Sequence, residues 1–123
     1  LAHQIEAGCD MFLMPSKYEP CGLNQLYSLR YGTIPIVRAT GGLADTVTDY
    51  AARGGSGTGF SFENYSSREM MDAIRRALAV YSSGREWQAL VRRSMAQDWS
   101  WDQSARKYKQ LYQEIAREKR ADR

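Results

Sequence analysis

The sequence holds 123 residues, of which 43% are hydrophobic and 25% charged, with a formal net charge of +3. These values fit one globular domain with a real core, and no apolar run approaches the length of a membrane span. Four of the last eight residues are basic (Arg117, Lys119, Arg120, Arg123) against two acidic, so the rest of the chain carries about +1, too little to indicate nucleic-acid binding. We expect this basic tail to be a solvated, fraying helix end.

Cysteine and histidine are scarce. Cys9 and Cys21 favour free thiols in a reducing cytoplasm over a disulfide framework. A metal site is not expected, because His3 is the single histidine and no paired cysteine spacing occurs. The chain begins within a helical pattern and without an initiator methionine, which predicts a piece of a longer protein.

The first half alternates helix and strand patterns. A short helix over residues 1–7 is expected to end at Gly8, and another over 23–31 at Gly32, in the left-handed conformation. Strands are predicted at residues 10–14, 34–37 and 60–62. Residues 46–49 fit either a short strand or a turn, and residues 53–59 a flexible glycine-rich loop. Strands separated by helices predict an α/β fold, a Rossmann-like parallel sheet with flanking helices.

The second half is predicted to be a helical C-terminal section. Three capping boxes mark its helix starts: Ser66 with Glu69, Ser83 with Glu86, and Ser100 with Gln103. One helix is expected to bury a face made of Met70, Ile74, Ala77, Leu78 and Tyr81, and the last helix a stripe made of Tyr108, Leu111, Tyr112 and Ile115. Trp87, Trp99 and Trp101 either pack the corners between helices, which we favour, or stack on sugar from an exposed position.

The most informative segment is residues 19–26, Glu-Pro-Cys-Gly-Leu-Asn-Gln-Leu, which joins the first strand to the second helix. This turn lies at the carboxyl end of a parallel strand, where ligands bind, and its exposed N–H groups suit an anion. The amides of Cys21, Gly22 and Leu23 should converge on one space. Glu19 is either a surface carboxylate that helps to cap the helix or, as we favour, part of a site for a ligand with phosphate and hydroxyl groups.

Other polar residues lie near this turn. Asn24 and Gln25 are available to a phosphate or hydroxyl, although Asn24 could equally be a local cap. Cys21 at a helix start could be nucleophilic, but the lone His3 makes a Cys-His pair a poor hypothesis.

A second glycine turn, Thr40-Gly41-Gly42-Leu43, follows the next strand. Its glycines would let backbone approach a ligand closely. Asp45 and Asp49 are expected to be turn or cap residues, and Arg38 faces either phosphate or solvent.

Residues 15–47, from Pro-Ser-Lys-Tyr-Glu-Pro-Cys-Gly-Leu to Thr-Gly-Gly-Leu-Ala-Asp-Thr-Val, closely resemble the bacterial glycogen synthases and plant starch synthases. These are retaining glucosyltransferases of the two-Rossmann-domain (GT-B) type. Later segments, including Phe60 and the helices from Trp101 to Tyr112, resemble the rest of the family's C-terminal domain. The resemblance therefore identifies residues 1–123 as part of that domain.

The resemblance implies roles for particular residues. Glu19 would contact hydroxyls of the transferred glucose, and the amides around Gly22, Leu23 and Asn24 would hold sugar and diphosphate. The Thr40–Leu43 turn matches a second family motif near the nucleotide-sugar cleft. Tyr27 stands where the wider superfamily has a second glutamate, as is typical of glycogen and starch synthases.

The implied reaction transfers glucose, with retention, from ADP-glucose to the non-reducing end of an α-1,4-glucan. UDP-glucose is a less favoured donor, and no cofactor or metal is expected. The acceptor site, a Lys-x-Gly-Gly motif and the phosphate-binding basic pair would lie upstream, so the fragment is expected to need its own N-terminal domain and to be inactive alone. We expect the partners to include neither nucleic acid nor a membrane. We expect a cytoplasmic location, or a plastidial one in a plant. The alternatives are a GT-B enzyme with another donor and a non-catalytic nucleotide- or glucan-binding module.

Overall fold

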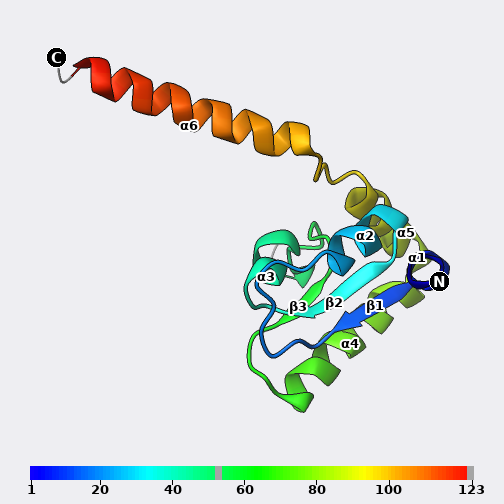
Figure 1. Cartoon of the computed structure of the whole chain (residues 1–123). Helices are drawn as coiled ribbons and strands as arrows, with labels where there is room; N and C mark the ends of the chain where they lie inside the picture. The colour runs from blue at the N-terminus through cyan, green and yellow to red at the C-terminus, as the bar shows by residue number, and fades with distance from the viewer. Residues whose placement is uncertain (52–53, 122–123) are drawn as a thin grey trace.

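The computed structural model describes residues 1–51 and 54–121, and its centre is a parallel sheet (Figure 1). The strands are β1 (Met11–Met14), β2 (Ile34–Arg38) and β3 (Phe60–Phe62), hydrogen-bonded in the order β1-β2-β3. Met11 lies opposite Ile34, and Ile36 opposite Phe60. The predicted parallel α/β arrangement is confirmed, although β1 begins one residue later and β2 ends one residue later than the pattern indicated.

Helices connect the strands, as the alternation predicts. α1 (Ala2–Gly8) precedes β1, and α2 (Asn24–Tyr31) links β1 to β2. α2 ends at Gly32, whose φ of +82° confirms the predicted left-handed stop. The short helix α3 (Gly42–Thr46) was not predicted; beyond it, Asp49 pairs with Gly59 in an isolated parallel bridge.

The core lies on both faces of the sheet, because alternate side chains of a strand point to opposite sides. Ile34 and Ile36 pack with Phe60 against α4 (Ser67–Ser82) and α5 (Gly84–Met95). On the other face, Val37 packs with Met14, and with Leu43 and Val47 from the α3 region. The central strand is therefore buried throughout residues 34–37, as a strand covered on both faces should be.

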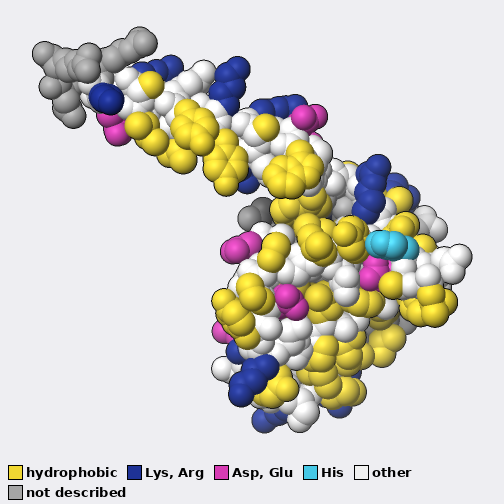
Figure 2. Space-filling model, in the orientation of Figure 1, with side chains coloured by type: hydrophobic (Ala, Val, Ile, Leu, Met, Phe, Trp, Pro, Cys, Tyr) yellow, Lys and Arg dark blue, Asp and Glu magenta, His cyan; other side chains and the backbone are white. Residues whose placement is uncertain are grey.

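The last helix, α6 (Trp101–Ala121), extends away from the sheet and its covering helices (Figure 1). Its predicted apolar stripe forms one visible row (Figure 2), but that row is exposed, not packed. The packing expected of Trp99 and Trp101 is also wrong: they are 44% and 86% exposed, whereas Trp87 is buried. Because α6 extends away from the sheet and its covering helices, these side chains stay exposed.

Two smaller expectations about the helices need correction or limits. In α4, Leu78 and Tyr81 are exposed, while Ala77 with Met70 and Ile74 contacts the core as predicted. Arg117 and Lys119 are exposed, in agreement with a solvated tail, while the Arg120 side chain and Arg123 lie outside the described structure. None of the described helices is long and apolar enough to cross a membrane.

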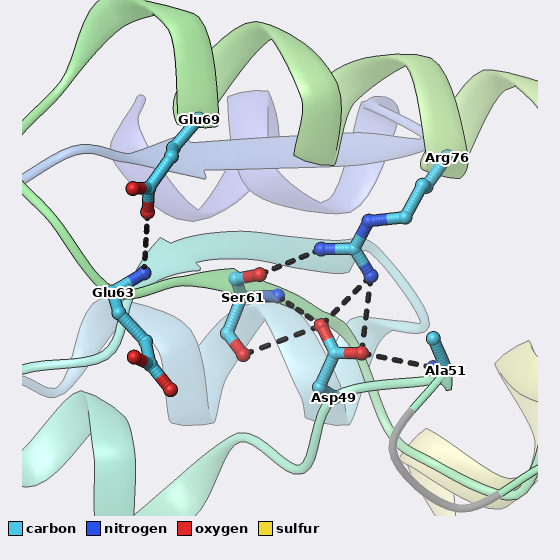
Figure 3. Close-up of polar contacts among 6 residues, drawn as sticks. All are labelled: Asp49, Ala51, Ser61, Glu63, Glu69 and Arg76. Atoms are coloured by element: carbon cyan, nitrogen blue, oxygen red, sulfur yellow. Dashed lines mark hydrogen bonds and ion pairs between the residues drawn. The ribbon is translucent and has the colours of Figure 1, made fainter.

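The capping boxes mark the helix starts correctly but do not form as reciprocal caps. Ser66 and Ser83 make no side-chain cap bond. Instead the Glu69 carboxylate accepts a hydrogen bond from the backbone N–H of Glu63 at 3.2 Å (Figure 3). It also accepts one from the backbone N–H of Asn64 at 2.8 Å, and both donors precede the helix. Gln103 donates to the Asp98 carboxylate at 3.1 Å.

A partly buried ion pair ties the chain before β3 to α4 (Figure 3). The Arg76 guanidinium donates to both oxygens of Asp49 at 3.0 Å and to the Ser61 carbonyl at 2.6 Å. Asp49 also accepts the Ala51 N–H, so the predicted turn role is confirmed, but the ion pair was missed. Burial alone would raise the pKa of Asp49, but the Ser61 N–H and Arg76 outweigh it and hold that pKa below its usual value.

Candidate functional site

The two glycine turns that the sequence singled out meet at the carboxyl ends of β1 and β2. The Gly42 N–H donates to the carbonyl oxygens of Glu19 (3.1 Å) and Pro20 (3.2 Å). A Cβ at Gly41 would overlap the Glu19 carbonyl, and one at Gly42 would overlap the Cys21 carbonyl. The two backbones are therefore in direct contact, which requires glycine at both positions.

Free backbone donors line the start of α2. In the part of the chain that the structure describes, the four N–H groups from Cys21 to Asn24 meet no hydrogen-bond acceptor. Leu23 is the N-cap and supplies no side-chain bond, so the alternative of Asn24 as the cap is wrong. Unpaired amides at the positive end of a helix suit an anion, and the predicted anion site at this turn stays a prediction.

The Glu19 side chain is half-buried beside these amides. Its carboxylate forms no hydrogen bond or ion pair with any described residue, so it does not cap α2. A carboxylate without a protein partner is available to hydroxyl groups of a ligand. The predicted ligand role of Glu19 stays a prediction that this geometry permits.

Gln25 differs from the prediction. Its side chain is fully buried and therefore not available to a ligand. Asn24 is exposed and remains available. Its Nε2 donates to the carbonyls of Cys21 (3.1 Å) and Gly22 (3.2 Å) and to the Thr46 hydroxyl (3.2 Å). Sequence reasoning also missed Thr46, because its link to Gln25 joins residues 21 positions apart.

The Arg38 guanidinium lies at the surface, in agreement with the solvent-facing alternative, but it also has protein partners. Its guanidinium donates to the carbonyl of Lys17, after β1, and to that of Glu63 (3.0 Å), after β3. It also lies 5.7 Å from the centre of the Tyr65 ring. Arg38 therefore joins the loops at two strand ends.

The remaining candidates are placed as follows. Thr40 is half-buried and its carbonyl accepts the Leu43 N–H at 3.1 Å, which closes the second turn. Asp45 lies in the first turn of α3. The thiols of Cys9 and Cys21 are both exposed and free. His3 packs edge-on against Tyr27, with ring centres 4.9 Å apart, and forms no hydrogen bond with Cys21.

Two further features concern the loops and metal ligands. The loop before β3 is held by α5: Arg93 donates to the carbonyls of Gly55 (2.9 Å) and Gly57 (2.7 Å), while Arg53 of the predicted loop lies outside the described residues. Among the residues described, no three His, Cys, Asp or Glu side chains come together in a way that could hold a metal ion.

Comparison with known proteins relates this geometry to a family. Residues 2–92 match the family described as Glycosyl transferases group 1. The glycogen synthase of Koribacter versatilis (strain Ellin345) is 57% identical over 113 residues, covering 92% of this chain and 23% of that relative. The glycogen synthase of Anaeromyxobacter sp. (strain K) is 58% identical over 118 residues, covering 94% of this chain and 24% of that relative. The chain thus spans about a quarter of the length of these curated relatives.

A solved structure gives the same result for the fold. The catalytic domain of Starch Synthase IV from Arabidopsis thaliana, bound to ADP and acarbose, superposes with a TM-score of 0.83 at 39% identity. The superposition covers 92% of this chain and 24% of that one. The Rossmann-like fold of a GT-B C-terminal domain is confirmed. Because the family match extends over residues 2–92, the chain belongs to the glycosyl transferase group 1 family.

Proposed function

We propose that the chain is the C-terminal part of a glycogen synthase, which transfers glucose from ADP-glucose to the non-reducing end of an α-1,4-glucan with retention. Two relatives named glycogen synthase support this proposal at 57% and 58% identity. A starch synthase of the same fold binds ADP and acarbose. We call the longer polypeptide that would contain this chain the parent protein.

The observation that carries the proposal is the junction of the two glycine turns. Four free N–H groups and an unpartnered carboxylate lie within one short strand-to-helix turn, with the second turn packed against its backbone. The amides of residues 21–24 would hold the diphosphate of the donor, and the backbone of Thr40, Gly41 and Gly42 would border the same cleft. Glu19 would bind glucose hydroxyls and favour the positive charge that develops at the sugar ring.

This arrangement favours a departing diphosphate that needs no metal ion, because helix-start amides can meet part of its negative charge. The four backbone donors of this turn are neutral, so the remaining charge calls for basic side chains, which we expect from elsewhere in the parent protein. The site in this chain is therefore one half of an active site. We expect the 123-residue chain alone to transfer no glucose.

The exposed apolar surface of the C-terminal section supports a partner within the parent protein. A groove of about 640 Å³ lies between α2 and the start of α6, lined by residues that include Leu23, Tyr27, Met95, Trp99 and Trp101. The exposed stripe of α6 lies farther along the same helix. Exposed apolar patches of this kind mark interaction surfaces. We propose that the N-terminal domain of the parent protein covers the groove and the stripe.

The test is glucose transfer to glycogen by the parent protein, with ADP-glucose and UDP-glucose compared as donors. We expect transfer from ADP-glucose, at a higher rate than from UDP-glucose, and none from the isolated chain. Transfer only from another nucleotide sugar would indicate a different group 1 enzyme. Nucleotide or glucan binding without transfer by the parent protein would indicate a binding module and would refute the proposal.

We also propose a cytoplasmic location for the parent protein. Both cysteines of the chain are free and exposed, which suits a reducing compartment. Fractionation of cells that produce the parent protein would test this location.

A further inference from the structure

Gln25 occupies an unusual position for a polar side chain. It lies in the first turn of α2, yet it is fully buried. Its Nε2 faces two carbonyl oxygens, of Cys21 and Gly22, and the Thr46 hydroxyl. The orientation of the amide is therefore determined, because reversal would set Oε1 against two carbonyl oxygens.

These bonds determine where the neighbouring N–H groups point. Each peptide unit is planar and trans here, so its C=O and N–H point in opposite directions. Because Gln25 Nε2 donates to the Cys21 carbonyl, the Gly22 N–H of the same peptide unit points away from Gln25. Because it also donates to the Gly22 carbonyl, the Leu23 N–H points away from Gln25 as well. Both N–H groups are among those that meet no acceptor in the described structure.

Gly22 makes this geometry possible. Its φ is +71°, a conformation that side chains rarely adopt. A Cβ at this position would lie 2.5 Å from Gln25 Oε1 and 2.9 Å from Gln25 Nε2. Glycine at position 22 and glutamine at position 25 are thus two parts of one arrangement.

The same side chain also connects the two turns. The Thr46 hydroxyl accepts from Gln25 and donates to the Gly42 carbonyl at 2.6 Å. The Gly42 N–H in turn donates to the carbonyls of Glu19 and Pro20. Gln25 and Thr46 therefore close a ring of hydrogen bonds that fixes the backbone of Glu19 relative to the free amides.

We infer that Gln25 is a positioning residue of the donor site: its buried amide aims the Gly22 and Leu23 N–H groups at an anionic ligand and holds the Glu19 turn at a fixed distance. The inference rests on the proposed function for the identity of that ligand, a nucleoside diphosphate sugar. The hydrogen-bond ring itself is a property of this chain and can be tested without activity.

The test uses the parent protein with Gln25→Met, which keeps the length of the side chain but removes its donors. Ser28→Ala is the matched control, because Ser28 is equally buried on α2 and its hydroxyl donates only to the Gln25 carbonyl within the same helix. For Gln25→Met we expect the ADP dissociation constant to rise about tenfold or more, since hydrogen bonds to charged groups are among the strong ones. A displacement of about 1 Å at the reacting groups would also lower kcat about 100-fold.

Hydrogen exchange supplies the readout that does not need activity. In Gln25→Met, a peptide covering residues 40–46 should exchange faster than in the wild type and in Ser28→Ala, because the Gly42 N–H loses its fixed acceptors. In Gln25→Glu the same peptide should exchange at least as fast as in Gln25→Met, since an ionised carboxylate would face two carbonyl oxygens. Unchanged exchange together with an ADP affinity equal to that of Ser28→Ala would overturn the inference.

The measurements distinguish failure of the proposed function from failure of the positioning role of Gln25. A wild-type parent protein that transfers glucose from no nucleotide sugar would refute that function, while the exchange measurement would still decide on the hydrogen-bond ring. If Gln25→Met does not fold, Thr46→Val against Thr46→Ser tests the ring, since only serine keeps the hydroxyl. We expect faster exchange of residues 40–46 in Thr46→Val alone; equal exchange in the two variants would contradict the ring.

Discussion

The contact between the two glycine turns makes Gly42→Ala a sharp test of the site. The new Cβ would lie 2.6 Å from the carbonyl carbon and 2.7 Å from the Cα of Cys21. Carbon atoms in contact are about 3.5–4.0 Å apart, so the turns would have to separate by about 1 Å. Rotation of a side chain cannot relieve this overlap, because the three nearest atoms to the Cβ are backbone atoms of Cys21.

That separation sets the expected magnitudes. The bond from the Gly42 N–H to the Glu19 carbonyl, now 3.1 Å, would lengthen to roughly 4 Å and be lost. Overpacking of this kind costs about 1–3 kcal/mol in the free energy of unfolding. If Glu19 is displaced from the sugar by about 1 Å, kcat for glucose transfer should fall about 100-fold.

The assay compares kcat of the parent protein carrying Gly42→Ala with that of Gly84→Ala. Gly84 begins α5, and a Cβ there would meet nothing within 4 Å, so we expect wild-type activity from this control. Thermal unfolding of the 123-residue chain gives the stability change in parallel. A kcat for Gly42→Ala equal to that of Gly84→Ala would refute the view that the spacing of the two turns positions Glu19.

Three further predictions concern other parts of the chain. In the parent protein, Glu19→Gln should remove about 2.7–4 kcal/mol of transition-state stabilisation and so lower kcat, while the ADP dissociation constant stays unchanged, because Glu19 is assigned to the sugar. Equal loss of ADP binding would contradict that role. The pKa of Asp49 is lower in the folded chain than in the unfolded chain, so the ionised carboxylate stabilises the fold above the unfolded pKa of about 3.9, and this stabilisation is lost as pH falls through the folded pKa. The difference in thermal midpoint between wild type and Asp49→Asn should therefore shrink below about pH 4. A constant difference would refute this linkage. Leu111→Ser, on the exposed stripe of α6, should change the free energy of unfolding of the isolated chain by less than about 0.5 kcal/mol. In the parent protein it should lower the thermal midpoint, whereas the polar control Gln113→Ser should not. No difference between these two variants in the parent protein would argue against a covered stripe.

Much of the architecture could be predicted from the sequence because its determinants are local. Alternating helix and strand patterns identified β1, β2 and β3, and Gly32 marked the end of α2 through its tolerance of positive φ. The turn at residues 19–26 could be assigned to the anion-binding end of a parallel sheet for the same reason. The free amides from Cys21 to Asn24 agree with that assignment.

The errors arose where a local pattern depends on a distant partner. The stripe of α6 has the periodicity of a packed helix, but periodicity does not say whether a packing surface lies within the same chain. Trp99 and Trp101 were misassigned for that reason. The capping boxes identified helix starts, but Glu69 bonds to the preceding turn instead of to Ser66.

The sequence by itself determined the fold class, the family and the turn that carries Glu19, since each is encoded in a short run of residues with its own conformational preferences. Only the tertiary structure decided how the turns are held together. The roles of Gln25, Thr46 and Gly42 come from hydrogen bonds and backbone contacts between segments about twenty residues apart. No local preference encodes such a contact, because it exists only after β1 and β2 have paired and brought their carboxyl ends to the same edge of the sheet.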